Sequence, residues 1–135
     1  MKDFKFLAMK FKFFLIVLYL MIAIATKAQT VTKLSADEFE KKMTATKEKT
    51  ILDVRTDSEY KEGRLADATQ LDYYKDDFKK QVDKLDKTKP IFVYCKGGGR
   101  SNSSCEILRA LGFKEVYDLK GGITSWKDAN KPIVK

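Results

Sequence analysis

The chain has 135 residues, two cysteines and no histidine, with 27 basic against 19 acidic residues. This length fits one domain with a modest core, and the lack of histidine excludes zinc sites of the Cys/His type. Basic and acidic residues are interleaved without a cluster of one sign, so no nucleic-acid partner is expected.

Residues 1–28 have the pattern of a secretory signal peptide. Four lysines precede the apolar run 13–25, and the segment ends in Thr26-Lys27-Ala28. A basic start, an apolar core of about 7 to 15 residues and a small-residue cleavage site define such a peptide. The 13 apolar residues fall short of the about 20 that span a bilayer, which disfavours the alternative of an uncleaved anchor. We expect cleavage after Ala28, a periplasmic or secreted mature chain, 29–135, and no stable membrane insertion after cleavage.

Removal of this segment makes the charge balance mild. Five lysines and one acidic residue lie in 1–28, so 29–135 keeps 22 basic and 18 acidic residues and a net charge of +4. Such a balance is typical of a solvated surface rather than of a binding patch for a polyanion.

The first half of the mature chain alternates helix and strand signals. The pattern predicts an apolar lead-in at 31–34, a helix to about residue 45, a strand at 50–54, a short helix closed by Gly63, a weak strand at 68–71 and a helix at 76–85. The first two helices each begin with a capping box, Ser35-Ala36-Asp37-Glu38 and Thr56-Asp57-Ser58-Glu59.

The second half predicts a strand at 91–94, a helix at 101–111 stopped by Gly112, a strand at 115–119, a turn at Gly121-Gly122 and a last helix at 123–129. The strand Ile91-Phe92-Val93-Tyr94 is apolar throughout and suits a central parallel strand. Alternating strands and helices predict an α/β domain with a mainly parallel central sheet flanked by helices on both faces. Ligands of such sheets bind beyond the carboxyl ends of the strands, where Cys95 lies.

The loop Cys95-Lys96-Gly97-Gly98-Gly99-Arg100-Ser101 is the strongest functional signal. Its lysine precedes the glycines, so it is not a nucleotide-binding P-loop. Consecutive backbone N–H groups form an anion-binding concavity, and glycines permit the positive φ values that this requires. The helix start at Ser101, together with Lys96 and Arg100, also favours a thiolate, so Cys95 is a candidate nucleophile that needs no histidine. The alternative is a flexible loop beside a buried cysteine.

Four segments occur in an order and spacing that together are specific. They are Leu52-Asp53-Val54-Arg55 with Glu59-Tyr60 and Glu62-Gly63; Ile91-Phe92-Val93-Tyr94-Cys95; the loop from Cys95 to Ser101, of the form Cys-x-x-Gly-x-Arg; and Gly112-Phe113 with Gly121-Gly122 and Trp126. In these segments the chain resembles the single-domain rhodaneses over almost the whole mature part. The resemblance implies a rhodanese-like domain at 29–135.

The resemblance also implies a sulfurtransferase. Cys95 would accept a sulfane sulfur from a donor such as thiosulfate, form a persulfide, and pass the sulfur to cyanide or another thiophilic acceptor, including a protein thiol. No cofactor and no metal are implied. The substrate would be bound by the loop residues Lys96, Gly97, Gly98, Gly99, Arg100 and Ser101. Asp53 and Arg55 are expected to support the loop through an ion pair or hydrogen bonds.

Two other functions share this loop. One is a non-catalytic anion- or protein-binding module or sulfur carrier, and the other is a phosphatase or arsenate reductase of the same fold. The latter enzymes have a Cys-x5-Arg loop, whereas four residues separate Cys95 from Arg100, so the smaller ring favours sulfur. The chain departs from the rhodaneses at Arg64, where histidine is usual, and at Asp67, where glycine is common.

Two further residues are expected to pack in the core. Cys105 lies inside the helix that follows the loop, and a disulfide with Cys95 would require a Cα separation below about 7 Å. We therefore expect Cys105 to be a buried small hydrophobe with a free thiol. Trp126 is expected to pack the last helix, because large aromatic side chains dominate core burial.

Overall fold

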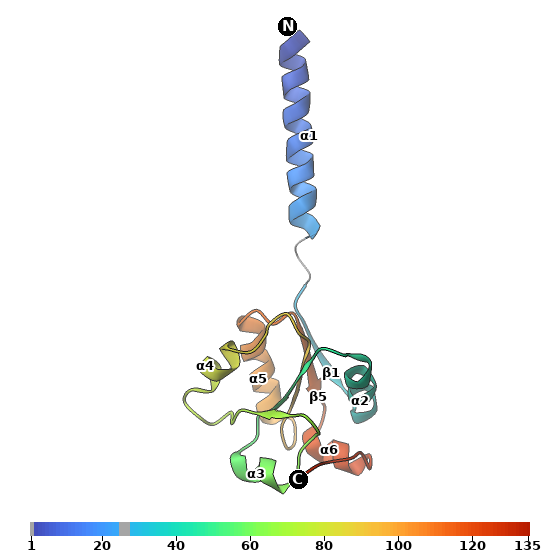
Figure 1. Ribbon diagram of the computed structural model, residues 1–135, viewed down its shortest axis with the longest axis vertical. Helices are drawn as coiled ribbons and strands as arrows, with labels where there is room; N and C mark the ends of the chain where they lie inside the picture. Colours follow the sequence, from blue (N-terminus) through green and yellow to red (C-terminus); the bar gives the residue numbers. More distant parts are fainter. Residues whose placement is uncertain (1, 25–27) are drawn as a thin grey trace.

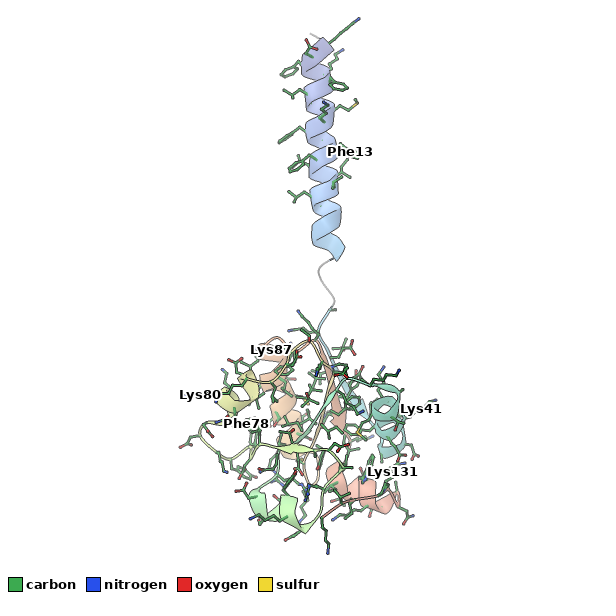
Figure 2. The ribbon with its side chains drawn as sticks, in the orientation of Figure 1. Phe13, Lys41, Phe78, Lys80, Lys87 and Lys131 are labelled. Atoms are coloured by element: carbon green, nitrogen blue, oxygen red, sulfur yellow. The ribbon has the colours of Figure 1, made fainter. Side chains whose placement is uncertain are left out.

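The computed structural model describes residues 2–24 and 28–135. Helix α1 (Lys2–Ile24) covers most of the predicted signal peptide and lies outside the α/β domain (Figure 1). Its described side chains are exposed, including Phe13 at 69% (Figure 2). Among the described residues, no helix is both long and apolar enough to cross a membrane. Residues 26 and 27 of the predicted cleavage site lie outside the described residues.

Strands and helices alternate through the rest of the chain, as the sequence predicts. They are β1 (Thr30–Leu34), α2 (Ala36–Ala45), β2 (Thr50–Asp53), α3 (Asp57–Glu62), β3 (Thr69–Gln70), α4 (Phe78–Asp83), β4 (Ile91–Tyr94), α5 (Gly99–Ala110), β5 (Glu115–Leu119) and α6 (Gly122–Asp128). The five strands form one parallel sheet in the order β1-β5-β4-β2-β3. The predicted α/β fold with a parallel sheet is confirmed.

Helices cover both faces of the sheet, with α2 and α6 on one side and α4 and α5 on the other (Figure 1). The central strand β4 serves both layers because its side chains alternate between the faces. Phe92 and Tyr94 belong to the apolar cluster under α2 and α6, and Ile91 and Val93 to the cluster under α4 and α5. All four residues are buried, as expected for a central parallel strand.

Both predicted capping boxes are present. Ser35 and Thr56 accept hydrogen bonds from the backbone N–H groups of Glu38 and Glu59, and these glutamates bond back to the cap residues. Trp126 is buried, stands edge-on to Phe39 and donates its indole N–H to the Pro132 carbonyl at 2.9 Å. Local signals therefore predicted these features correctly.

Several predicted boundaries were wrong; the helix predicted at 76–85, for example, spans only Phe78–Asp83 as α4. Residues 31–34 are part of a strand rather than a lead-in, because β1 pairs with β5 at the sheet edge. Helix α5 begins at Gly99, two residues before the predicted start, with Gly98 as its left-handed N-cap. Helix α6 begins at Gly122, so residues predicted to form only a turn open a helix.

The two departures from the rhodanese pattern lie in one connection. Asp67 has a φ of 60°, and Ala68 donates to the Leu65 carbonyl at 3.4 Å, so a turn places Asp67 where glycine is favoured. Aspartate is among the residue types that tolerate this conformation. Arg64 pairs with Val134 through backbone hydrogen bonds of 2.9 and 2.8 Å, and its guanidinium lies over the Tyr60 ring. The backbone of Arg64 therefore fixes the C-terminal segment to the domain.

Basic side chains are spread over the domain surface. Lys41 of α2 and Lys131, which follows α6, lie on one side of the domain, and Lys80 of α4 lies on the other (Figure 2). Lys131 is paired with Asp37 at 2.8 Å. This distribution agrees with the absence of a single basic patch in the sequence.

Candidate active site

The site is centred on Cys95, which directly follows the central strand β4. Its side chain is 1% exposed, and both cysteines of the chain carry free thiols. The backbone N–H of Gly98 donates to the Cys95 sulfur at 3.0 Å, and the thiol lies 3.5 Å from the Ser101 hydroxyl oxygen. The loop therefore curls around the sulfur, as the sequence predicts.

Gly98 has a special backbone conformation that its two neighbours lack. Its φ is 110°, whereas Gly97 and Gly99 lie outside the left-handed region. The positive φ values expected of the glycine run are therefore needed at its middle position alone. The first hydrogen bond of helix α5 runs from the Asn102 N–H to the carbonyl of the N-cap residue Gly98, at 3.1 Å. The N–H groups of residues 99–101 come before it and are available to an anion.

The start of α6 sets the direction of the loop. Ile123 donates its N–H to the Cys95 carbonyl at 2.8 Å, and Thr124 donates to the Lys96 carbonyl at 3.1 Å. In a trans peptide the N–H points opposite to the carbonyl, so the N–H groups of Lys96 and Gly97 point away from α6. The loop thus presents donors rather than acceptors on its free side, which suits an anionic ligand.

Gly122 makes this approach possible. It has a φ of 60°, and a Cβ at this position would lie 2.5 Å from the Cys95 carbonyl oxygen and would also overlap the Lys96 carbonyl. The sequence signal is the pair Gly121-Gly122, which predicts a turn and belongs to the rhodanese pattern but does not by itself indicate a contact with the loop. Its contact with the loop depends on the tertiary structure.

Arg100 is held by a partner that the sequence analysis missed. Its guanidinium forms two bonds of 2.8 Å with the two carboxylate oxygens of Glu59, and it lies 5.4 Å from the centre of the Tyr74 ring. Bonding to Arg100 lowers the pKa of Glu59 from its usual value of 4.5 to about 2. The same carboxylate closes the capping box of α3, so Glu59 connects that helix to the start of α5.

Lys96 differs from Arg100 in being available to solvent. Its side chain is exposed, and no ion pair of the described residues includes it. Of the two loop cations, Lys96 is therefore free to approach an anionic donor, whereas Arg100 braces the loop.

Asp53 and Arg55 form the expected ion pair. Both are buried, and the Arg55 Nε and Nη2 atoms lie 2.9 and 2.6 Å from the two carboxylate oxygens of Asp53. Arg55 also donates to the Gly63 carbonyl at 2.7 Å, and its guanidinium lies over the Tyr94 ring. The pair contacts the residue before Cys95, so its support of the loop is indirect.

Cys105 lies in α5 beneath the site. It is buried among apolar side chains, and this burial raises the pKa of its thiol well above the usual value. The predicted role in packing agrees with this position.

Comparison with known proteins agrees with this geometry. The Rhodanese-like domain family matches residues 35–129. The chain belongs to this family. Among rhodanese-like relatives, the thiosulfate sulfurtransferase GlpE of Coxiella burnetii is 42% identical over 87 residues, which are 60% of this chain and 79% of the relative. The putative sulfurtransferase YtwF of Bacillus subtilis is 31% identical over 102 residues, which are 76% and 96% of the two chains.

Solved structures show the same rhodanese-like fold. The crystal structure of a rhodanese-related protein from Thermoplasma volcanium superposes with a TM-score of 0.68 at 28% identity. The match covers 76% of this chain and 97% of that chain. The rhodanese resemblance in the sequence is thereby confirmed.

Replacement of Gly122 tests the contact between α6 and the loop. We expect Gly122→Ala to lower the free energy of unfolding by about 2–4 kcal/mol, because overpacking against two carbonyls and left-handed strain act together. The matched control is Gly97→Ala, whose added Cβ would meet no atom within 4 Å and should change stability by less than about 1 kcal/mol. Urea denaturation measures both, and equal losses would contradict the contact.

Replacement of Glu59 tests the ion pair with Arg100. Its folded pKa lies below the unfolded value, so the pair stabilises the fold fully above pH 4.5 and loses this effect as the pH falls towards 2. Glu59→Gln preserves the capping box, which accepts either glutamate or glutamine at this position. Loss of the ion pair should lower the free energy of unfolding by about 1–2 kcal/mol near pH 7. The deficit should shrink in acid. Glu62→Gln, an exposed change in the same helix, is the control for urea titrations, and a pH-independent deficit would refute the pairing.

Proposed function

We propose that this rhodanese-like protein is a sulfurtransferase that carries a sulfane sulfur on Cys95. The observation that carries the proposal is the loop of backbone donors around the buried sulfur, with Gly98 N–H at 3.0 Å. Relatives named as sulfurtransferases support the same class of reaction. The proposed donor is thiosulfate and the proposed acceptor is cyanide or another thiophile.

The reaction takes place in two displacements. The Cys95 thiolate attacks the outer sulfur of thiosulfate, the S–S bond of the donor breaks, and sulfite leaves with the bonding electron pair. Cyanide then attacks the terminal sulfur of the persulfide, and the thiolate leaves as thiocyanate forms. The enzyme alternates between two covalent states, so ping-pong kinetics are expected.

Loop groups supply the charge stabilisation in both steps. The Gly98 N–H donates to the sulfur, and the N–H groups of the loop and of the first turn of α5 are the proposed donors to the terminal sulfur. Donors fixed in place stabilise developing charge without reorganisation. Lys96 is the exposed cation that attracts the thiosulfate dianion. Four residues separate Cys95 from Arg100, one fewer than in a Cys-x5-Arg loop, and this smaller ring disfavours a phosphatase.

Substitution of the nucleophile tests this reaction. The purified protein should form thiocyanate from thiosulfate and cyanide and gain one sulfur, about 32 Da, on Cys95. Cys95→Ser should abolish both signals, because a serine hydroxyl forms no persulfide. Cys105→Ala, which removes the packing thiol, should keep both. If no sulfane donor yields the adduct on Cys95, the proposal fails; an aryl phosphate assay tests the alternative directly.

We further propose that residues 1–28 are a signal peptide and that the mature protein is periplasmic or secreted. The basic-apolar-small pattern and the location of α1 outside the domain support this. In a host with a periplasm, the intact mass of the exported protein should correspond to residues 29–135, with or without the loss of ammonia that accompanies cyclisation of Gln29. Ala28→Arg should leave the precursor uncleaved, because signal peptidase requires a small residue there. A full-length wild-type chain would contradict the prediction.

A further inference from the structure

Asp118 is a buried carboxyl group that the reaction described above does not use. It lies in β5 and is 2% exposed. Its Oδ1 is the buried side-chain oxygen that has no hydrogen-bond partner among the described residues. An unsatisfied buried carboxylate costs stability, so its presence in a small domain requires an explanation.

A row of three side chains connects this carboxyl group to the candidate nucleophile. The Cys95 sulfur lies 3.5 Å from the Ser101 oxygen, and the Asp118 side chain lies close enough to Ser101 for that hydroxyl to favour the carboxylate form. Ser101 is fully buried, so solvent does not interrupt the row. The three residues come from the end of β4, the first turn of α5 and the end of β5.

The hydroxyl of Ser101 can act as a relay because it both accepts and donates. It has one proton and two lone pairs, so it can accept from the thiol while donating elsewhere. The Gly98 carbonyl, 3.2 Å away, is a second acceptor for the Ser101 proton. Rotation about the Cβ–Oγ bond of Ser101 selects between Gly98 and Asp118.

The charged and titratable groups around Asp118 are few. Lys33 of β1 is in register with Asp118, and its charge favours the carboxylate, although its side chain is exposed. Cys105 of α5 and Cys95 are the thiols on the same face of the sheet. Burial has the largest effect and raises the pKa of Asp118 above its usual value. Asp118 therefore holds a proton more readily than an exposed aspartate does.

We propose that Asp118 accepts the proton of Cys95 through Ser101 and so acts as the internal base of a protein that has no histidine. The thiol proton moves to the Ser101 oxygen while the hydroxyl proton moves to Asp118, and the S–H bonding pair stays on sulfur. A thiol and a carboxylate thus become a thiolate and a carboxylic acid, with no other reactant. Asp118 acts through Ser101 and does not touch the substrate.

This proposal rests on Cys95 being the nucleophile of the proposed function, and it has a consequence for pH dependence. Internal transfer forms the thiolate without loss of a proton to solvent. While the pair of groups shares one proton, the thiolate fraction is therefore independent of pH. Without Asp118 the thiol must lose its proton to solvent, so the thiolate fraction rises tenfold per pH unit below its titration midpoint.

The test is the rate of Cys95 alkylation by iodoacetamide, a neutral reagent, measured from about pH 5 to pH 9 around the thiol's ordinary titration range. Mass spectrometry of the Cys95 peptide gives the adduct on this thiol alone. The wild-type rate should be nearly flat across neutral pH. Asp118→Asn and Ser101→Ala should slow it at least about tenfold near pH 6 and give a slope of about one logarithm per pH unit.

Two comparisons separate the relay from a general structural effect. Ser104→Ala removes another buried hydroxyl of α5, which donates to the Arg100 carbonyl at 2.8 Å and should leave the flat profile unchanged. The double variant with Asp118→Asn and Ser101→Ala should be no slower than the slower single variant, because both interrupt one path. Thermal denaturation should show Asp118→Asn melting at or above the wild type, because the variant removes an unsatisfied buried charge.

A purely structural Asp118 predicts the opposite kinetic result. Removal of a buried negative charge would then favour the thiolate, so faster or unchanged alkylation in Asp118→Asn would overturn the relay. If Asp118→Asn does not fold, Ser101→Ala provides the same test. An alkylation rate that stays independent of pH in Ser101→Ala would also overturn the relay. Alkylation does not measure sulfur transfer, so a flat wild-type profile without thiocyanate formation would refute the proposed function and leave the relay intact.

Discussion

The two hydrogen bonds from the start of α6 to the Cys95 and Lys96 carbonyls are the constraint on which the site depends. They orient the loop peptides so that N–H groups face the free side, and they require a residue without Cβ at position 122. The parallel sheet brings the end of β4 and the end of β5 to one edge, where α6 begins. The anion-binding character of the loop is thus a product of sheet topology as well as of glycine content.

The cations of the site have separate tasks. Arg100 is bound to the carboxylate of Glu59, 41 positions away in the sequence, whereas Arg55 is bound to the nearby carboxylate of Asp53 and to the Gly63 carbonyl. Lys96 is exposed and has no such partner among the described ion pairs. Paired guanidinium groups suit a bracing role because their planar geometry matches two carboxylate oxygens, whereas an ammonium on a flexible stem suits capture of a mobile anion.

Asp118 shows how stability and reactivity can oppose each other in a small domain. A buried carboxyl group with one unsatisfied oxygen weakens the fold, and an asparagine of the same shape would lower that cost because it carries no charge. The chain has no histidine, and in the proposed relay the buried carboxyl group of Asp118 accepts the thiol proton instead. This role would explain why a destabilising group is present in the core.

The sequence by itself determined the alternation of strands and helices, both capping boxes, the buried central strand and the location of Cys95 beyond its end. These features depend on the spacing of residues that are close in the sequence, and that spacing is the same whatever the tertiary structure. The tertiary structure decided that Glu59 pairs with Arg100 across 41 positions, that Gly122 meets the loop, that residues 30–34 form an edge strand and that Asp118 interacts with Ser101. Each of these depends on the packing of segments distant in the chain, and no local pattern encodes that packing.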